Sequence, residues 1–166
     1  QPDEFEHLHA AWLVSQGQTP YVDFFQHHTP LFYYIAAPFL SGTDLGFDTI
    51  LNLRLLILLF WVSTTLISWL WLRRYGQIHG FLAICMLASN STMLSFGHII
   101  FLDTVSIPLL MLSAMLIAGG GGKPRWILAS GILFGLAVLT NLKASMAMFA
   151  PILIMVSRGW VAREDP

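Results

Sequence analysis

Long apolar runs separated by short polar segments make up most of the chain after residue 50. Leu55 to Leu72 contains no charged residue and is rich in Leu, Ile and Trp, which predicts a membrane-spanning helix, since about 20 apolar residues cross the hydrocarbon. Asp48 is placed to cap the start of that helix. Four further spans are expected from the apolar runs 81–96, 104–118, 126–141 and 144–157.

These apolar runs must be helices, because in lipid every backbone N–H and C=O has to be bonded within its own segment. Pro108 and Pro151 are expected to kink the helices that contain them. The sequence therefore predicts an all-α, polytopic transmembrane helix bundle of about five spans over residues 51–166. Residues 1–50 are expected to form an extracytoplasmic loop with amphipathic, interfacial helices.

Composition supports a membrane protein: 56% of the 166 residues are hydrophobic and 10% are charged, whereas a soluble domain carries about 25% charged residues. The net charge of −1 gives no reason to expect nucleic acid as a partner. Cys85 is the single cysteine, so a disulfide framework within the chain is excluded. The chain begins with Gln1 and is expected to be part of a larger membrane protein.

The basic residues predict the orientation of the bundle. Basic residues lie between the first and second spans, between the third and fourth, and after the fifth. These three places fall on one side of a five-span bundle. The basic residues concerned are Arg73, Arg74, Lys123, Arg125, Arg158 and Arg163. The positive-inside rule makes that side cytoplasmic. The opposite, extracytoplasmic side then receives the acids Asp3, Glu4, Glu6, Asp23, Asp44, Asp48 and Asp103.

The segment from Asp3 to Gln16 is expected to be an amphipathic helix that ends at Gly17. Phe5, Leu8 and Trp12 recur at helical spacing and would form its apolar stripe.

Asp3 has two interpretations at the start of this helix. Asp3 with Glu6 three residues later resembles a capping box. Alternatively, Asp3, Glu4 and His7 share one helix face, because residues three and four apart are neighbours. The two roles are compatible, since a cap fixes its carboxylate rigidly.

The segment from Tyr21 to Leu40 is rich in aromatic residues, which is typical of an interfacial belt. The adjacent His27 and His28 are candidates for donating to phosphate oxygens or binding metal, and a solvated pair without a role is the alternative. His7 and His9 offer metal-ligand types as well, but residues two apart on a helix do not share a face.

Asp103 stands where the second span gives way to the third, a position at which an ionisable residue is a functional candidate. The alternative is that Asp103 caps the third helix. His98 precedes it closely and can reach the same pocket. Lys143 lies at the outer turn after the fourth span and either contributes to this site or snorkels. Arg54 either pairs with an outer acid or reaches the headgroups.

Several of these residues carry a resemblance to a known family. Asp3-Glu4, then Pro20-Tyr21-Val22-Asp23, then His28-Thr29-Pro30-Leu31 resembles the first extracytoplasmic loop of the GT-C membrane glycosyltransferases, in particular the dolichyl-phosphate-mannose protein mannosyltransferase-like and lipid A aminoarabinose transferase-like families. Asp103 matches an acid at the start of a family helix, and residues 135–140 match a Gly-Leu-Ala-x-Leu-Thr motif before a lysine. Thr29 departs from the family's Pro-Pro-Leu, and Lys143 follows two residues later than is usual.

The resemblance implies an integral plasma (inner) membrane glycosyltransferase that uses a polyprenyl-phosphate sugar as donor and a lipid, glycan or protein as acceptor. Asp3 would be the catalytic carboxylate, Glu4 would support it, and Asp103 would be a second acid in the same cavity. His28 and Lys143, with His27 beside them, would approach the donor phosphate.

Around these residues, His7, Tyr21, Asp23 and His98 are expected to line the pocket. No cofactor is required, although a divalent metal ion is compatible with the acids, with Asp3 and Asp103 as candidate ligands.

Two other function classes fit the residues. In a transporter or flippase, the outer acids and His98 would relay protons or bind a polar solute. In a non-catalytic membrane subunit, the polar loop would bind a partner protein. The clustering of the acids at one face, with few ionisable residues deep in the spans, favours the transferase over the transporter.

Overall fold

The computed structural model describes residues 2–40, 47–89 and 99–149. Within these ranges every regular element is helical, which confirms the all-α class. The α-helices are α1 (Pro2–Ser15), α2 (Leu31–Ala36), α3 (Phe47–Leu72), α4 (Gln77–Ser89), α6 (Leu102–Gly119) and α7 (Pro124–Thr140). Three 3₁₀ helices join them, η1 (Ala37–Phe39), η2 (Arg73–Tyr75) and η3 (Leu142–Met148).

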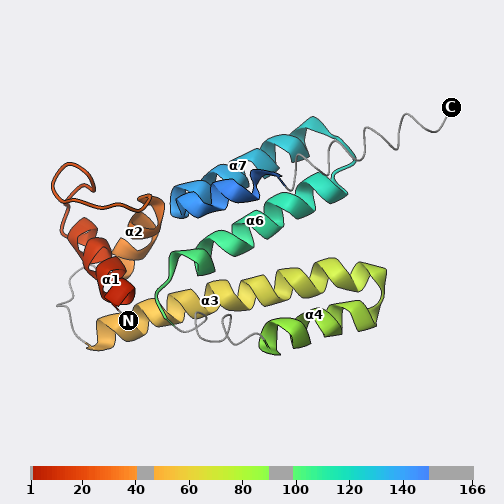
Figure 1. The fold of residues 1–166 in the computed structure, drawn as a ribbon, viewed down its shortest axis with the longest axis horizontal. Helices are drawn as coiled ribbons and strands as arrows, with labels where there is room; N and C mark the ends of the chain where they lie inside the picture. Colours follow the sequence, from red (N-terminus) through yellow and green to blue (C-terminus); the bar gives the residue numbers. More distant parts are fainter. Residues whose placement is uncertain (1, 41–46, 90–98, 150–166) are drawn as a thin grey trace.

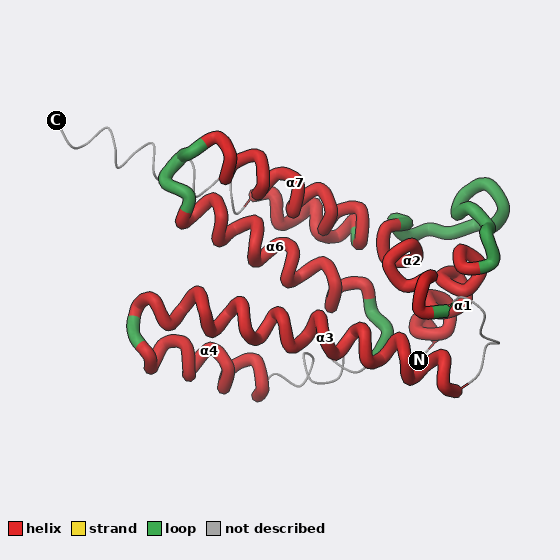
Figure 2. Tube along the Cα trace, turned by 180° about the vertical axis from the view of Figure 1, so that it is seen from behind, coloured by secondary structure: helices red, strands yellow, loops and turns green. Residues whose placement is uncertain are grey.

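The long helices form two antiparallel pairs, α3 with α4 and α6 with α7, and α6 packs against α3 to join them (Figure 1). The short helices α1 and α2 lie across one end of this arrangement, near the start of α3 (Figure 1). From behind, α1 and α2 again occupy that end, while the turns between α3 and α4 and between α6 and α7 occupy the other (Figure 2). The bundle therefore has the short helices α1 and α2 at one end and the two interhelical turns at the other.

Two described helices are long and apolar enough to cross a membrane: α3 continued by η2 (Phe47–Tyr75, 29 residues) and α6 (Leu102–Gly119, 18 residues). The helices α4 and α7 are shorter and apolar. Leu55 and Leu59 are exposed on α3, at 60% and 64%. Large apolar side chains on an outer helix face are expected against lipid, because contact with lipid removes their apolar surface from water.

The third and fourth expected spans correspond to α6 and α7, with ends that agree within two residues. The first span begins at Phe47 rather than Leu55, so Asp48 lies in the first turn of α3 and not at its cap. The sequence boundary was wrong because the charge of Arg54 interrupts the apolar run, whereas in the fold an ion pair with Glu4 neutralises this charge. Pro108 lies inside α6 without ending it.

The other two expected spans are described in part. Helix α4 covers the beginning of the run 81–96 and starts earlier, at Gln77, while residues 90–98 lie outside the described ranges. The run 144–157 begins as the 3₁₀ helix η3, and its remainder after residue 149, including Pro151, is also outside them. At the start of η3, the side-chain oxygen of Asn141 accepts the backbone N–H of Lys143 at 3.1 Å.

Hydroxyl groups within the long helices are satisfied by backbone carbonyls, as a low-dielectric surrounding requires. Ser68 donates to the carbonyl of Thr64 at 2.7 Å, one turn earlier in α3. Ser113 on α6 and Ser130 on α7 are both buried, and each hydroxyl donates to the other residue's carbonyl, at 3.0 and 2.9 Å. These paired serines allow close approach of α6 and α7.

The far end of the bundle gathers basic residues. Arg74, from the turn after α3, lines the same pocket of about 230 Å³ as Gly119, Gly120 and Trp126 around the α6–α7 turn. Gly121 and Gly122 take positive φ values of 58° and 73°, which glycine adopts without the clash of a Cβ. The fold thus brings the basic turns expected on one side to the same end.

Helix α1 matches its expected range, but its orientation corrects the predicted stripe. Phe5 is 59% exposed, whereas Glu4 and His7 are buried together with Leu8 and Ala11. The expectation of an apolar face over Phe5 was wrong because polar groups on α1 are paired with partners on distant elements, as described below. Burial of this face is therefore decided by long-range contacts and not by the local pattern.

The two ends of α1 differ in how well the sequence predicted them. The helix begins at Pro2, so Asp3 lies in its first turn and is not the cap, which corrects the capping-box interpretation. Gly17, at φ 87°, ends it as expected. The N–H of Gly17 bonds to the carbonyl of Val14 and the N–H of Gln18 to that of Leu13, at 2.9 and 3.1 Å, which is the Schellman arrangement.

Candidate active site

A partly buried ion pair fixes α1 to the bundle. Nε and Nη2 of Arg54 on α3 donate to Oε1 and Oε2 of Glu4, at 2.8 and 2.9 Å, and the backbone N–H of Ile100 donates to Oε1 at 3.2 Å. The hydrogen bond from Arg54 lowers the pKa of Glu4, against the opposing effect of burial, and the bond from Ile100 lowers it further. Glu4 is thus held as a carboxylate that ties α1 to α3 and to the segment before α6.

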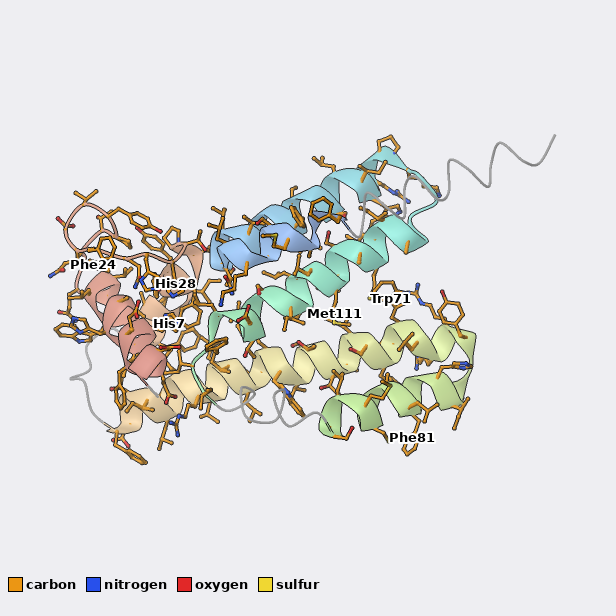
Figure 3. The ribbon with its side chains drawn as sticks, in the orientation of Figure 1. His7, Phe24, His28, Trp71, Phe81 and Met111 are labelled. Carbon is orange, nitrogen blue, oxygen red and sulfur yellow. The ribbon has the colours of Figure 1, made fainter. Side chains whose placement is uncertain are left out.

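One turn along α1, His7 is buried within a group of rings. Its Nδ1 lies 3.3 Å from the hydroxyl of Tyr33, and its ring centroid lies 5.0 Å from that of His28 and 6.5 Å from that of Phe101. Burial, followed by the proximity of His28, lowers the pKa of His7 to about 4. Figure 3 shows His7 and His28 at the end of the molecule formed by α1 and α2. His7 is therefore a neutral imidazole at physiological pH.

The loop between α1 and α2 presents the two adjacent histidines in a fixed conformation. The side-chain oxygen of the buried Gln26 accepts the backbone N–H groups of both His27 and His28, at 2.7 and 3.1 Å. The two imidazole centroids are 4.0 Å apart. His27 is exposed and His28 is half-buried, so one side chain faces solvent while the other reaches toward His7.

Two of the expected pocket residues hold this loop in place. The hydroxyl of Tyr21 donates to the backbone carbonyl of His28, and Tyr21 itself has the left-handed φ of 67° that is uncommon for a bulky residue. Asp23 accepts the backbone N–H of Thr19 at 2.7 Å. Both side chains are exposed, and their contacts position the histidines from within the loop.

Asp103 lies in the first turn of α6 and is not its cap, which is Phe101. Oδ1 of Asp103 accepts Nδ2–H of Asn141 at 2.6 Å, and the side-chain oxygen of Asn141 accepts the backbone N–H of Lys143 at 3.1 Å. The capping interpretation of Asp103 was therefore wrong, because this carboxylate is engaged by the end of α7. Asn141 is buried and connects Asp103 to the backbone of Lys143 in the first turn of η3.

The electrostatics of His28 indicate which other candidates lie near it. Burial, then the neighbouring His27, lowers the pKa of His28; Glu6 opposes this, Lys143 adds to the lowering, and Asp3 opposes it. Asp3 and Lys143, which are far apart in sequence, thus both lie within electrostatic range of His28. Both have exposed side chains, which leaves them accessible to a ligand.

The structure therefore places several of the predicted site residues near one another. The ring of His28 lies beside those of His7 and His27, and Asp3 and Lys143 lie within electrostatic range of it. Asp103 is connected to the backbone of Lys143 through the side chain of Asn141. His98 lies outside the described residues.

Among the residues that the structure describes, the side chains that could share a metal ion are Glu6, His27 and His28, whose ligand atoms lie within 4.8 Å of one another. This set contains His27 and His28, which the sequence offered as metal-binding candidates, together with Glu6, and it does not contain the expected Asp3 and Asp103. Sequence reasoning also missed Gln26 and Asn141. A polar residue directly after the apolar run of α7 was the available signal for Asn141, whereas nothing local distinguished Gln26.

The geometry can be compared with known proteins. No curated protein and no solved structure matches the chain. The family model of the dolichyl-phosphate-mannose-protein mannosyltransferases matches residues 27–164, which is most of the chain and includes the histidine pair, α3, α6 and α7. The match begins after α1, so the assignment of Asp3 and Glu4 to the candidate site rests on the fold and the sequence resemblance and not on this match. By this match, the chain belongs to the dolichyl-phosphate-mannose-protein mannosyltransferase family, a family of membrane-bound glycosyltransferases.

Proposed function

We propose that this protein transfers a sugar from a polyprenyl-phosphate-linked donor to a lipid, glycan or protein acceptor at the extracytoplasmic face of the plasma (inner) membrane. The observation that carries the proposal is the convergence of an acid and cationic or N–H donor groups at one end of an apolar bundle. Asp3 and Lys143 both lie within electrostatic range of the half-buried His28 at this end, while Arg74 and the α6–α7 turn lie at the other.

In the proposed reaction, a hydroxyl or amine of the acceptor attacks the anomeric carbon of the donor sugar. The new bond forms as the bond from that carbon to the phosphate oxygen breaks, and polyprenyl phosphate leaves with the electron pair. Asp3 takes the proton that the acceptor loses, which is the task of a general base. Because the phosphate is already a good leaving group, positioning and charge stabilisation are the main demands on the protein.

The groups that would hold the phosphate are Lys143, as an ammonium donor, and His28, as an N–H donor. The lowered pKa of His28, which burial causes, leaves a neutral ring that still donates through one nitrogen. His27 stands beside them on the exposed side of the loop. An isoprenoid tail would lie along apolar helix surface such as the outer face of α3, where Leu55 and Leu59 are exposed.

Glu4 and Asp103 have different proposed roles. Both carboxylate oxygens of Glu4 are bonded to Arg54, so Glu4 acts as a positioning residue for Asp3 one residue before it. Asp103 keeps its second oxygen, Oδ2, as the group through which it would serve as the second acid of the site, while Oδ1 is bonded to Asn141.

The test uses the complete protein in nanodiscs, a panel of polyprenyl-phosphate sugars and crude membrane acceptors, with donor consumption as the readout. Wild type should consume at least one donor, and Asp3→Asn should abolish consumption while retaining folding and insertion. The matched control is Asp48→Asn, which removes an exposed acid from the first turn of α3 and should retain activity. Near-normal rates for Asp3→Asn would show that the assigned base is wrong. Failure of folded wild type to consume any donor would favour the transporter, and solute flux in proteoliposomes would test it.

A further inference from the structure

The end of the bundle that lies opposite α1 carries four positive charges. Arg73 and Arg74 lie in the turn after α3, and Lys123 and Arg125 lie at the start of α7; both turns occupy this end (Figure 2). Within the described ranges, every carboxylate belongs to α1, to the loop after it, or to the first turn of α3 or α6. The 26 residues of α3 alone extend over about 39 Å. In this part of the chain, the four cations therefore have no carboxylate close to them.

Two of these arginines lie over tryptophan rings. Cζ of Arg73 is 4.4 Å from the ring centroid of Trp69, and Cζ of Arg125 is 5.1 Å from that of Trp126. Both distances are within the roughly 6 Å over which a cation is attracted to the face of a ring. Tryptophan is enriched where membrane proteins cross the interface between hydrocarbon and water. We therefore expect these guanidinium groups at the level of the lipid headgroups.

A pocket of about 230 Å³ connects the two turns. Arg74 lines it from the turn after α3, and Trp126 lines it from the first turn of α7. The wall from α6 is apolar and consists of Leu112, Met115 and Leu116. Leu112 lies two turns before the end of α6, which is about 10 Å toward the middle of the bundle. The pocket is therefore apolar along α6 and cationic where the turns meet.

The geometry around Arg74 leaves room for an anion. A Cβ placed on Gly119 would lie 3.6 Å from Nη1 of Arg74, so the glycine keeps this side of the guanidinium open. Helix α7 begins at the same pocket, and within the described part of the chain no side chain caps its first residue, Lys123. The N-terminus of a helix carries a partial positive charge that favours anions. Two side-chain cations and a helix end thus favour a negative charge here.

We propose that this pocket binds an anionic phospholipid, with its phosphate at Arg74 and the start of an acyl chain along α6. A guanidinium can donate to two phosphate oxygens at once. The apolar wall decides in favour of a lipid, because a free phosphate would gain nothing from Leu112, Met115 and Leu116. Basic pockets between membrane helices on the cytoplasmic side bind lipid headgroups, and the positive-inside rule predicts that this end is cytoplasmic. The site is separate from the proposed transferase site.

Two simpler roles of Arg74 give different results. As a cation at the C-terminal end of α6, it would only complement the helix dipole, and filling the pocket would leave lipid binding unchanged. As one charge of a diffuse basic surface, Arg74 would contribute to lipid binding no more than Arg73, which does not line the pocket. The experiment therefore compares loss of each charge with loss of the space.

The experiment measures lipid binding without any sugar donor, so that its outcome is independent of the proposed transferase reaction. The complete protein in a non-ionic detergent is titrated with phosphatidylglycerol, and the bound lipids are counted by native mass spectrometry. Phosphatidylcholine, which is zwitterionic, is titrated in parallel. Inorganic phosphate at millimolar concentration is added as a competitor, because it supplies the anion without the acyl chains.

Wild type should bind one phosphatidylglycerol at least tenfold more tightly than phosphatidylcholine, and inorganic phosphate should not displace it. Arg74→Gln should reduce this preference at least fivefold. Gly119→Leu should do the same with all four charges retained, because the new side chain starts beside Arg74 and fills the pocket. The matched control is Arg73→Gln, which removes an equal charge from the same turn and should change the preference less than twofold.

Folding of each variant is checked by circular dichroism and by its elution from a sizing column. Equal preference for phosphatidylglycerol in folded wild type and Arg74→Gln would overturn the proposal, as would equal losses in Arg73→Gln and Arg74→Gln. Retained preference in folded Gly119→Leu would overturn the assignment of the lipid to this pocket. Displacement of the lipid by inorganic phosphate would show that the site takes a free anion instead. If Gly119→Leu does not fold, the comparison of the two arginine variants still decides the question.

Discussion

Arg54 donates hydrogen bonds to both carboxylate oxygens of Glu4 and so joins the apolar helix α3 to α1, the helix that carries Asp3. The side chain of Glu4 is 4% exposed and that of Arg54 is 38% exposed, so the pair lies at the edge of the core. Removing one partner of a buried pair leaves an uncompensated charge in a surrounding of low dielectric constant. The pair therefore makes the position of Asp3 depend on a residue of the bundle.

We expect Arg54→Met to destabilise the protein by about 2–3 kcal/mol, somewhat below the roughly 3–5 kcal/mol typical of a fully buried pair, because Arg54 is partly exposed. Arg54→Lys should retain part of the stability that Arg54→Met loses, since an ammonium keeps the charge but cannot donate to both carboxylate oxygens in the geometry of a guanidinium. Thermal unfolding of the complete protein in nanodiscs measures both effects. Arg73→Met, which removes an exposed arginine at the far end, is the control. Equal stability of Arg54→Met and wild type would contradict the structural role of the pair.

The pH dependence of stability should reveal the buried His7. Its pKa is lowered from 6.5 to about 4 in the folded protein, first by burial and then by His28. Between these values the unfolded chain takes up a proton that the folded protein does not, so stability that is complete above pH 6.5 is lost as the pH falls toward 4. The loss is on the order of 3 kcal/mol.

Values of Tm measured from pH 8 to pH 4.5 test this expectation, and His7→Phe should flatten the profile because it removes the titrating group. Glu4 contributes to stability at lower pH. Its pKa is lowered, first by the hydrogen bond from Arg54, so its ionised form stabilises the fold above pH 4.5, and this stabilisation is lost as the pH falls below 4.5. The burial of His28 lowers its pKa in the same direction as that of His7. A slope that is as steep in His7→Phe as in wild type would assign the effect to another group.

The sequence predicted those parts of the fold that depend on local pattern. The apolar runs of α6 and α7 and the stop at Gly17 could be read directly, because length, hydropathy and a left-handed glycine determine them. The exposed Phe5 and the buried Glu4 could not, since the partners of Glu4 are Arg54 and Ile100, 50 and 96 residues away. Local spacing cannot distinguish an apolar stripe from a face that is buried by charge pairing.

The candidate site shows the same division. The basic turns predicted that Asp3 and Lys143 share one side of the bundle, and in the fold both lie within electrostatic range of His28. The capping role considered for Asp103 was wrong because Asn141, which packs beside it from the end of α7, supplies a hydrogen bond that no local rule indicates. Side chains that meet through tertiary structure thus determine the fine geometry of the site.

Asn141 is expected to act as a positioning residue between Asp103 and Lys143. Asn141→Leu removes the hydrogen bond to Asp103 and the acceptor for the N–H of Lys143, and should raise the KM for the donor by roughly tenfold if Lys143 holds the phosphate. A merely structural role would lower Tm and the amount of active enzyme without changing KM. Asn52→Leu, at an exposed position on α3, is the control. An unchanged KM in folded Asn141→Leu would argue against this arrangement.

Tyr21 should contribute through its hydroxyl, which holds the carbonyl of His28 from a backbone conformation that a bulky residue seldom adopts. Tyr21→Phe keeps the ring and removes this hydrogen bond, whose net value is about 0.5–1.5 kcal/mol. If the loop conformation matters for donor binding, the KM for the donor rises by about three- to tenfold while kcat stays the same. Tyr75→Phe, at the exposed far end, should leave KM unchanged. A fall in kcat without a change in KM would instead mean that Tyr21 acts on the reacting groups, because a residue that only positions the phosphate-binding loop affects the bound donor and the transition state alike.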